Sequence, residues 1–263
     1  VIRLPVNVID HMSRIFRDKL GKTERAIEEM KRAGKLNIEV LTNYSRLLKM
    51  KEWLDSKTGL RYFAMEGARL LLAEKLDIKD GDKVLDVGAG DGWFSIQAAL
   101  VCSNAEFFGV ELSEEFAEAM EYAKIFELKN VFFFYFDAYG LPFPDKVFDK
   151  IALYFALANI GFTKEDLVDL FTELNRVLKQ GGLLGIAEPF IEDFPGNMGI
   201  ILRELYNMCL EKEETILSQE NVKSALLDTG FKIIDISKIK LRNTGVSTRN
   251  AKKYLENYSR KLL

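Results

Sequence analysis

Short apolar segments alternate with amphipathic helical segments after residue 82, and this alternation constrains the fold more than any other feature. The apolar segments are rich in β-branched and aromatic residues and cover 83–87, 106–110, 131–136, 148–154 and 183–187. Residues 114–128 and 164–178 place apolar side chains three and four positions apart, which is typical of helices that pack on a sheet. The sequence therefore predicts an α/β fold with a doubly wound, mostly parallel sheet.

The regions on either side of these segments have helical patterns. Those at the N-terminal end cover residues 8–19, 23–33, 37–54 and 64–76, and they predict a helical extension over 1–76 that covers the strand ends as a lid. The sheet domain is expected over 77–263, with a helical insertion over 189–217 that contains a helix at 198–210. A helix over 219–228, a strand beginning at Phe231, a last strand near 242–248 and a final helix over 249–263 complete a predicted seven-stranded sheet.

Composition places the chain among globular proteins. Its 263 residues are 48% hydrophobic and 29% charged with 5 prolines, which excludes a disordered chain. Cys102 and Cys209 form no metal-binding or disulfide pattern, and no signal-peptide pattern is visible, so a cytoplasmic protein is expected. No apolar run approaches the roughly 20 residues that a membrane helix needs. The excess of Glu and Lys over labile amides favours a thermophilic source.

The net charge of −3 is unevenly distributed, because both ends of the chain are basic and the middle is acidic. Acidic side chains are mixed with the basic ones in the N-terminal helices, which is typical of solvated faces. Only Lys252, Lys253, Arg260 and Lys261 form a patch with little acid nearby. We therefore expect no nucleic-acid surface, and the sequence predicts no particular oligomeric state.

A glycine-rich segment, VLDVGAGDGWF, follows the first predicted strand at residues 84–94. Glycine permits positive φ and lets a ligand lie against the backbone at the carboxyl end of a strand in an open α/β sheet. The dinucleotide fingerprint needs a third glycine where Trp93 stands, and no Gly-Lys-Ser/Thr follows as in a Walker loop. The segment therefore predicts a ligand site at the carboxyl edge of the sheet. It does not match a dinucleotide site or a Walker-type phosphate site.

Four segments in order resemble the motifs of class I S-adenosylmethionine-dependent methyltransferases. They are the glycine-rich segment, GVELS at 109–113, FDAYGLPFPDKVFD at 136–149 and RVLKQGGLLGIAEP at 176–189. The resemblance implies a Rossmann-like fold and S-adenosylmethionine as cofactor, with Glu111 binding the ribose, Leu112 packing on the adenine, and Asp137 and Ala138 meeting the adenine edge. The remaining cofactor-binding residues that it implies are Asp86, Gly88, Ala89, Gly90, Gly92 and Tyr154.

The methyl acceptor of this family lies beside the end of the fourth strand, here residues 154–160 (YFALANI). No Asn/Asp-Pro-Pro-Tyr/Phe sequence occurs there, which argues against methylation of nucleobase amines. The layout is similar to the ubiquinone/menaquinone C-methyltransferase group, with Leu157 and Asn159 in that group's places and Ala158 where it has arginine. The resemblance thus implies a small-molecule acceptor whose identity stays open.

Several further side chains are candidates for the acceptor site. Asn159, Leu157 and Tyr139 are expected to contact substrate, and Glu188 and Tyr154 are the candidate catalytic residues. His11, the only histidine, could act as a base only if the N-terminal helices fold over the site. No metal-ligand pattern is present in the sequence, so no metal is expected.

Three functions remain open at this point. The leading hypothesis is C- or O-methylation of a small molecule by in-line displacement in a lidded pocket. An RNA or protein methyltransferase is the second, and a non-catalytic adenosyl-binding module is the third. An enclosed apolar cavity favours the first, whereas an open basic groove favours the second.

Overall fold

The structure is a computed structural model, and it describes residues 8–35, 37–55, 66–161, 163–194, 196, 199 and 217–238. Its elements in chain order are α1 (Val8–Arg32), α2 (Ile38–Asp55), α4 (Glu66–Lys75), β1 (Lys83–Val87), α5 (Trp93–Val101), β2 (Glu106–Glu111), α6 (Glu115–Ile125), β3 (Val131–Tyr135), β4 (Phe148–Tyr154), α7 (Leu157–Ile160), α8 (Lys164–Val177), β5 (Leu178–Ala187), the 3-10 helix η1 (Ile191–Asp193) and α10 (Gln219–Asp228).

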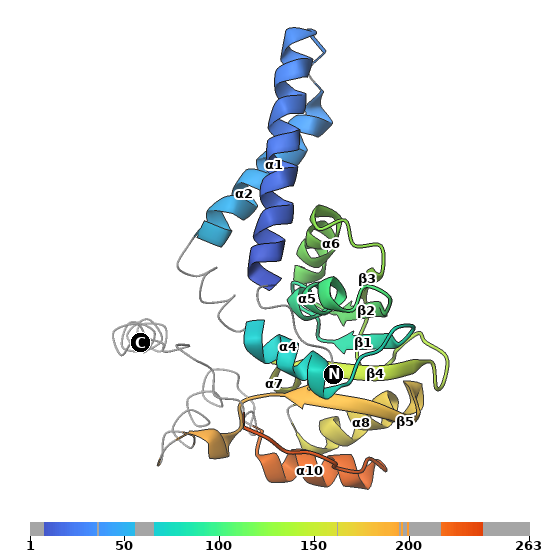
Figure 1. Ribbon diagram of the computed structural model, residues 1–263. Helices are drawn as coiled ribbons and strands as arrows, with labels where there is room; N and C mark the ends of the chain where they lie inside the picture. The colour runs from blue at the N-terminus through green and yellow to red at the C-terminus, as the bar shows by residue number, and fades with distance from the viewer. Residues whose placement is uncertain are drawn as a thin grey trace, which may run out of the picture.

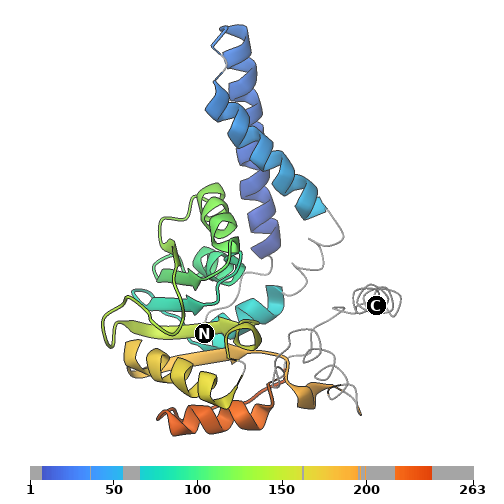
Figure 2. The same ribbon diagram turned by 180° about the vertical axis from the view of Figure 1, so that it is seen from behind.

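Five parallel strands form one sheet in the order β3-β2-β1-β4-β5. Helices α4, α5 and α6 lie on one face and α8 and α10 on the other, so the domain has three layers (Figures 1 and 2). Val84 packs in the core of the first face, whereas its neighbour Leu85 packs in the core of the second. Because both faces are buried, the strands read as continuous apolar runs. The predicted α/β fold with a parallel sheet is confirmed.

The strand expected at Phe231 is not found in the described part of the chain, since residues 231–238 pair with none of the five described strands. Side chains hold this segment instead, through ion pairs from Lys75 to Asp235 and from Lys238 to Asp193. A strand requires a neighbour that satisfies its backbone groups, and apolar alternation does not show whether one is available. The expected strand at 242–248 and the expected helix at 249–263 lie outside the described residues. The expected helix at 198–210 also lies outside the described residues, apart from Gly199.

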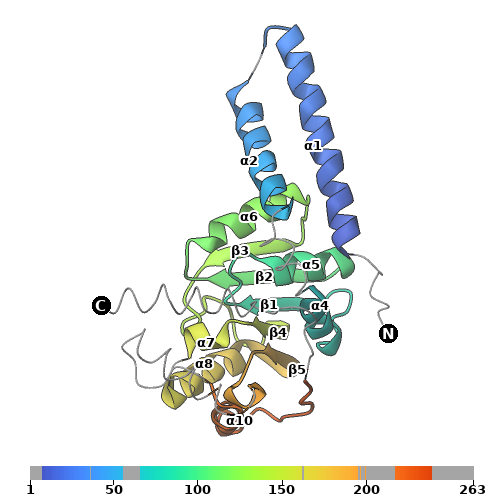
Figure 3. The ribbon, with the colours of Figure 1, turned by 90° about the vertical axis from the view of Figure 1, so that its left-hand side faces the viewer.

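The first two predicted helices, 8–19 and 23–33, form the single helix α1. Gly21 lies inside it, and a glycine in a helix interior costs only about 1 kcal/mol, which does not have to end the helix. Gly34, with φ +64°, stands just beyond the end of the helix, where glycine is common. Helices α1 and α2 run antiparallel as a hairpin that projects from the domain (Figure 3).

The hairpin rests on α5 and α6 through its base. Phe16 and Leu47 are buried in the core that contains α5. Lys19 Nζ donates to the carbonyl oxygens of Lys124 and Ile125, at the end of α6, over 3.0 and 3.2 Å. The described part of the hairpin therefore contacts the outer helices of the domain.

Cys102 is buried in the core, and burial raises the pKa of its thiol. Cys209 lies outside the described residues. Within the part of the chain that the structure describes, no helix is long and apolar enough to cross a membrane. No cluster of three or more potential metal-binding side chains occurs among these residues.

Candidate functional site

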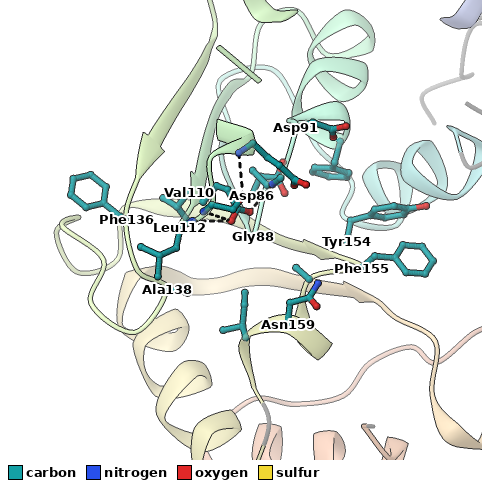
Figure 4. A pocket seen from close by; sticks show the side chains of 18 of the residues that line it. Asp86, Gly88, Asp91, Val110, Leu112, Phe136, Ala138, Tyr154, Phe155 and Asn159 are labelled. Carbon is teal, nitrogen blue, oxygen red and sulfur yellow. Dashed lines mark hydrogen bonds between the residues drawn. The ribbon is translucent and has the colours of Figure 1, made fainter. Parts of the chain in front are cut away.

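A cavity of about 710 Å³ opens at the carboxyl edge of the sheet, where the sequence predicts a ligand site (Figure 4). Its walls come from the loop after β1, the end of β2, the loop after β3 and the segment after β4. Nine of the ten predicted cofactor-binding residues line it, namely Asp86, Gly88, Ala89, Gly90, Glu111, Leu112, Asp137, Ala138 and Tyr154. The tertiary structure thus brings four separate segments of the chain to one site.

The glycines of the loop after β1 are needed for its shape. Gly88, Gly90 and Gly92 all have positive φ, at +66°, +53° and +82°. A Cβ on Gly88 would lie 2.6 Å from the Ala156 Cβ, and one on Gly92 would lie 2.8 Å from the Ala119 Cβ. Gly92 itself does not line the cavity but turns the chain into α5. The loop can therefore pack against α6 and the segment after β4 in this shape only with these glycines.

Glu111 ends β2 with its carboxylate fixed against the cavity wall. Its Oε2 accepts the Gly90 N–H at 2.8 Å, and its Oε1 accepts the N–H groups of Leu112 and Ser113 at 2.8 and 2.9 Å. A carboxylate has about four acceptor positions, so one remains for a ligand hydroxyl group and a second hydroxyl would have to share a position. This arrangement links the glycine loop directly to the predicted ribose-binding acid.

Asp86 is almost fully buried at the end of β1. Its Oδ2 accepts a hydrogen bond from the Ser95 hydroxyl at 2.7 Å, which ties the strand to the first turn of α5. Burial raises the pKa of Asp86 to about 7, while hydrogen bonds from Ser95 and the charge of Arg69 oppose this rise. At neutral pH this carboxyl group is therefore partly protonated.

The loop after β3 lines the cavity on the side away from Tyr154 and Phe155 (Figure 4). Leu112 is 53% exposed on the cavity wall, so it has no core role, and Ala138 faces the same space. Asp137 Oδ1 accepts the Tyr139 N–H at 3.0 Å, and the Tyr139 hydroxyl donates to the Ile160 carbonyl oxygen at 2.7 Å. Burial raises the pKa of Tyr139 to about 12, so its hydroxyl stays protonated and ties this loop to α7.

Two adjacent aromatic residues, Tyr154 and Phe155, line the cavity after β4, and their side chains point to the same side (Figure 4). Consecutive residues of a strand normally face opposite sides, but Phe155 has φ +52°, which turns the chain. The two rings lie 4.8 Å apart at 71°. Burial raises the pKa of Tyr154 to about 12, so its hydroxyl is a donor at neutral pH. Asn159 from α7 completes this wall.

Leu157 and Glu188 lie behind this wall and do not line the cavity. The Leu157 side chain is fully buried in the core, and its N–H donates to Glu188 Oε2 at 3.1 Å. The carboxylate also accepts backbone hydrogen bonds from Ala156 and Ala158, although burial raises its pKa to about 7. The structure therefore places Glu188 as a cap at the start of α7, and a contact of Leu157 with substrate could involve only its backbone.

Arg69 is a cavity residue that the sequence analysis missed. It lies on α4, is 2% exposed, and places its guanidinium carbon 5.2 Å from the centre of the Tyr154 ring. In the sequence, a single arginine next to the apolar residues Ala68, Leu71 and Leu72 was the available signal. His11 lies on α1, but its side chain is outside the description, so its role as a base stays a prediction.

Comparisons with known proteins agree with this geometry. Residues 84–182 match a family described as a methyltransferase domain. The chain is 35% identical over 122 residues to the demethylmenaquinone methyltransferase of Staphylococcus saprophyticus, a match that covers 46% of this chain and spans half of that protein's length. It is 28% identical over 173 residues to an O-methyltransferase of Aspergillus nomiae, covering 64% of this chain and 72% of that protein.

A solved structure of similar fold is an S-adenosylmethionine-dependent methyltransferase from Aquifex aeolicus. The TM-score is 0.54 at 22% identity, and the match covers 73% of this chain and 91% of the other. The sheet order, the glycine loop joined to an acid at the end of β2, and the family match together identify residues 84–182 as a methyltransferase domain. Its fold is similar to that of the S-adenosylmethionine-dependent methyltransferase from Aquifex aeolicus.

Proposed function

We propose that this chain transfers a methyl group from S-adenosylmethionine to carbon or oxygen of a small-molecule acceptor. The observation that carries the proposal is the bonding of the glycine loop to Glu111 at the rim of the cavity. The cavity volume of about 710 Å³ lies in the range of roughly 300 to 1,000 Å³ that is typical of small-molecule sites.

The described residues fit the cofactor. The loop at Gly88 and Gly90 leaves space for a ligand, and a Cβ on either glycine would narrow that space. Glu111 offers a hydrogen-bond acceptor to the ribose. Leu112 is an exposed apolar surface at the cavity, as a contact with adenine requires. Asp137 stands at the same end for the adenine amine.

The cofactor supplies an electrophilic methyl group, so the protein's part is to orient the acceptor and exclude water. The protonated Tyr154 hydroxyl can donate a hydrogen bond to an oxygen of the methyl acceptor. The Asn159 amide can both donate and accept hydrogen bonds. Tyr139 keeps the far wall attached to α7, which carries Asn159. Glu188 supports the same helix from behind and so acts on catalysis through α7.

The predicted lid is part of the proposal. From the N-terminal extension of residues 1–76, Arg69 lines the cavity, whereas none of the described residues 8–55 does. Among the described residues of this extension, only α4 would therefore contribute to a lid. The boundary near residue 77, the insertion at 189–217, the cytoplasmic location and the thermophilic source remain predictions.

Methyl transfer from tritiated cofactor into fractionated cell extract tests the function. We expect label in the metabolite fraction, and a Glu111→Ala variant serves as the inactive control. Label in RNA or protein would favour the second hypothesis, whose basic patch at Lys252, Lys253, Arg260 and Lys261 lies outside the described residues. Binding of the cofactor without transfer to any fraction would favour the adenosyl-binding module.

A further inference from the structure

β3 is an outer strand of the sheet, and none of the described strands lies beyond it (Figure 3). On its inner side, the Phe107 N–H of β2 donates to the Asn130 carbonyl oxygen at 2.8 Å. Alternate residues of a parallel strand bond to the same neighbour, so Val131, Phe133 and Tyr135 direct their backbone groups away from β2. Such a row of N–H and C=O groups is a template for pairing with another strand.

The strand carries none of the features that commonly protect a sheet edge. Its sequence, VFFFY at 131–135, contains no charge and no proline, and its register with β2 has no bulge. Phe132 is 39% exposed, because α8 packs at the other side of the sheet, on β5. The Phe132 and Phe134 rings lie 5.4 and 6.5 Å from the Phe108 ring between them. The edge therefore presents an aromatic surface beside its backbone groups.

A second copy of β3 fits this edge in one antiparallel register. When Phe133 lies opposite the same residue of the other copy, Val131 lies opposite Tyr135. All the outward backbone groups of the strand then pair in hydrogen bonds. The same register places Phe132 opposite Phe134, and aromatic pairs of this kind stabilise neighbouring strands.

Charged residues at the two ends of the strand are complementary in the same register. Lys129 precedes the strand, Asp137 follows it, and both side chains are exposed. Because each is four positions from Phe133, Lys129 of one copy lies opposite Asp137 of the other. Shifting the register by two residues, which keeps the backbone bonds, would place Asp137 opposite Glu127 or opposite Val131. Charge therefore favours the register that is centred on Phe133.

We propose that two copies of this chain associate through their β3 strands, about a twofold axis at Phe133, to form one continuous sheet. The same surface is used by both copies, as in most homodimers. Pairing covers the β3 edge of each copy, so this contact produces a dimer and no longer chain of molecules. The inference is independent of the proposed methyl transfer, because it rests on the edge of the sheet.

Sedimentation equilibrium of the full chain tests the backbone pairing, and we expect a dimer. Tyr135→Pro removes one outward N–H group and no bond to β2, and it should raise the dissociation constant of the dimer at least about tenfold. Tyr135→Ala keeps the N–H group and is the matched control, with a smaller change expected. A monomeric wild-type protein would leave this edge to another occupant and overturn the inference, as would equal dimer affinities of the two variants.

A charge exchange tests the register. Lys129→Glu and Asp137→Lys each place like charges opposite one another in the dimer of the variant, so each should weaken association by about fivefold or more. In an equimolar mixture the two variants face each other with opposite charges, and the mixture should associate about as tightly as the wild-type protein. Circular dichroism verifies that both variants are folded. A mixture that associates no more tightly than either variant alone would overturn the proposed register.

Discussion

The two ends of the cavity are built in different ways. The end near β1 and β2 is formed mainly by backbone, with glycines at positive φ and three N–H groups directed at Glu111. The end near β4 is formed by side chains from separate elements, including Tyr154 after β4, Asn159 on α7 and Arg69 on α4. Few substitutions are tolerated at the end that the backbone forms. At the end that side chains form, substitutions can change which ligand binds while the fold is retained.

The largest effect is expected at Gly92, where a side chain has neither space nor a favourable φ. Gly92→Ala places a Cβ 2.8 Å from the Ala119 Cβ at φ +82°, and we expect a loss of about 2 to 5 kcal/mol in the free energy of unfolding. Denaturant unfolding measures this loss. Gly140→Ala is the control, since nothing lies within 4 Å of its added Cβ, and it should be nearly neutral. Equal stabilities would mean that the loop is not constrained by its backbone.

Glu111→Ala should remove cofactor binding without unfolding the protein. We expect S-adenosylhomocysteine affinity to fall by about 2 to 4 kcal/mol, because charge-assisted hydrogen bonds to the ribose are lost. Calorimetry measures this change, with Glu106→Ala at the other, exposed end of β2 as control. Unchanged affinity would show that the ribose does not bind to Glu111. The end near β1 and β2 would then not be the cofactor end of the cavity.

Stability should fall as pH rises, with contributions from Asp86 in the cavity wall near β1 and from Glu188 behind the wall near β4. The pKa values of Asp86 and Glu188 are about 7, above their ordinary values of 3.8 and 4.5. Between those values and about 7 the folded state holds protons that the unfolded state has released, so raising the pH favours unfolding.

Thermal melts from pH 5 to pH 8 measure this slope. Asp86→Asn and Glu188→Gln should each flatten it, and the double variant should flatten it further. A slope that neither variant changes would contradict the assignment of this pH dependence to Asp86 and Glu188. A slope that only one variant changes would show which of the two carboxyl groups causes the pH dependence.

The smallest effect on stability is expected at Phe155. Phe155→Asn relieves a left-handed conformation that costs a bulky residue about 1 to 2 kcal/mol, but it removes the ring contact with Tyr154. We expect the free energy of unfolding to change by less than about 1 kcal/mol while methyl transfer into the metabolite fraction falls and cofactor affinity stays constant. Phe132→Ala, on the exposed side of β3, is the control for transfer. Unchanged transfer would remove Phe155 from the acceptor site.

Prediction from the sequence succeeded where a local pattern reflects a local physical requirement. The first four strands were placed to within one residue, and β5 extends five residues earlier than predicted. The nine predicted residues that meet in the cavity lie at the ends of strands or in the loops that follow them, and parallel strands bring those ends to one edge. Leu157 was misjudged because a strand-end motif does not show which way a side chain on the following turn points.

By itself the sequence determined the parallel sheet and the backbone-built end of the cavity, because apolar periodicity and glycine φ preferences act within a few residues. Only the tertiary structure decided that α1 is one helix, that residues 231–238 remain outside the sheet, and that Arg69 reaches Tyr154 from 85 residues earlier in the chain. These outcomes depend on which surfaces remain available for packing and hydrogen bonding once the other elements are in place. Such long-range competition leaves no trace in a local pattern.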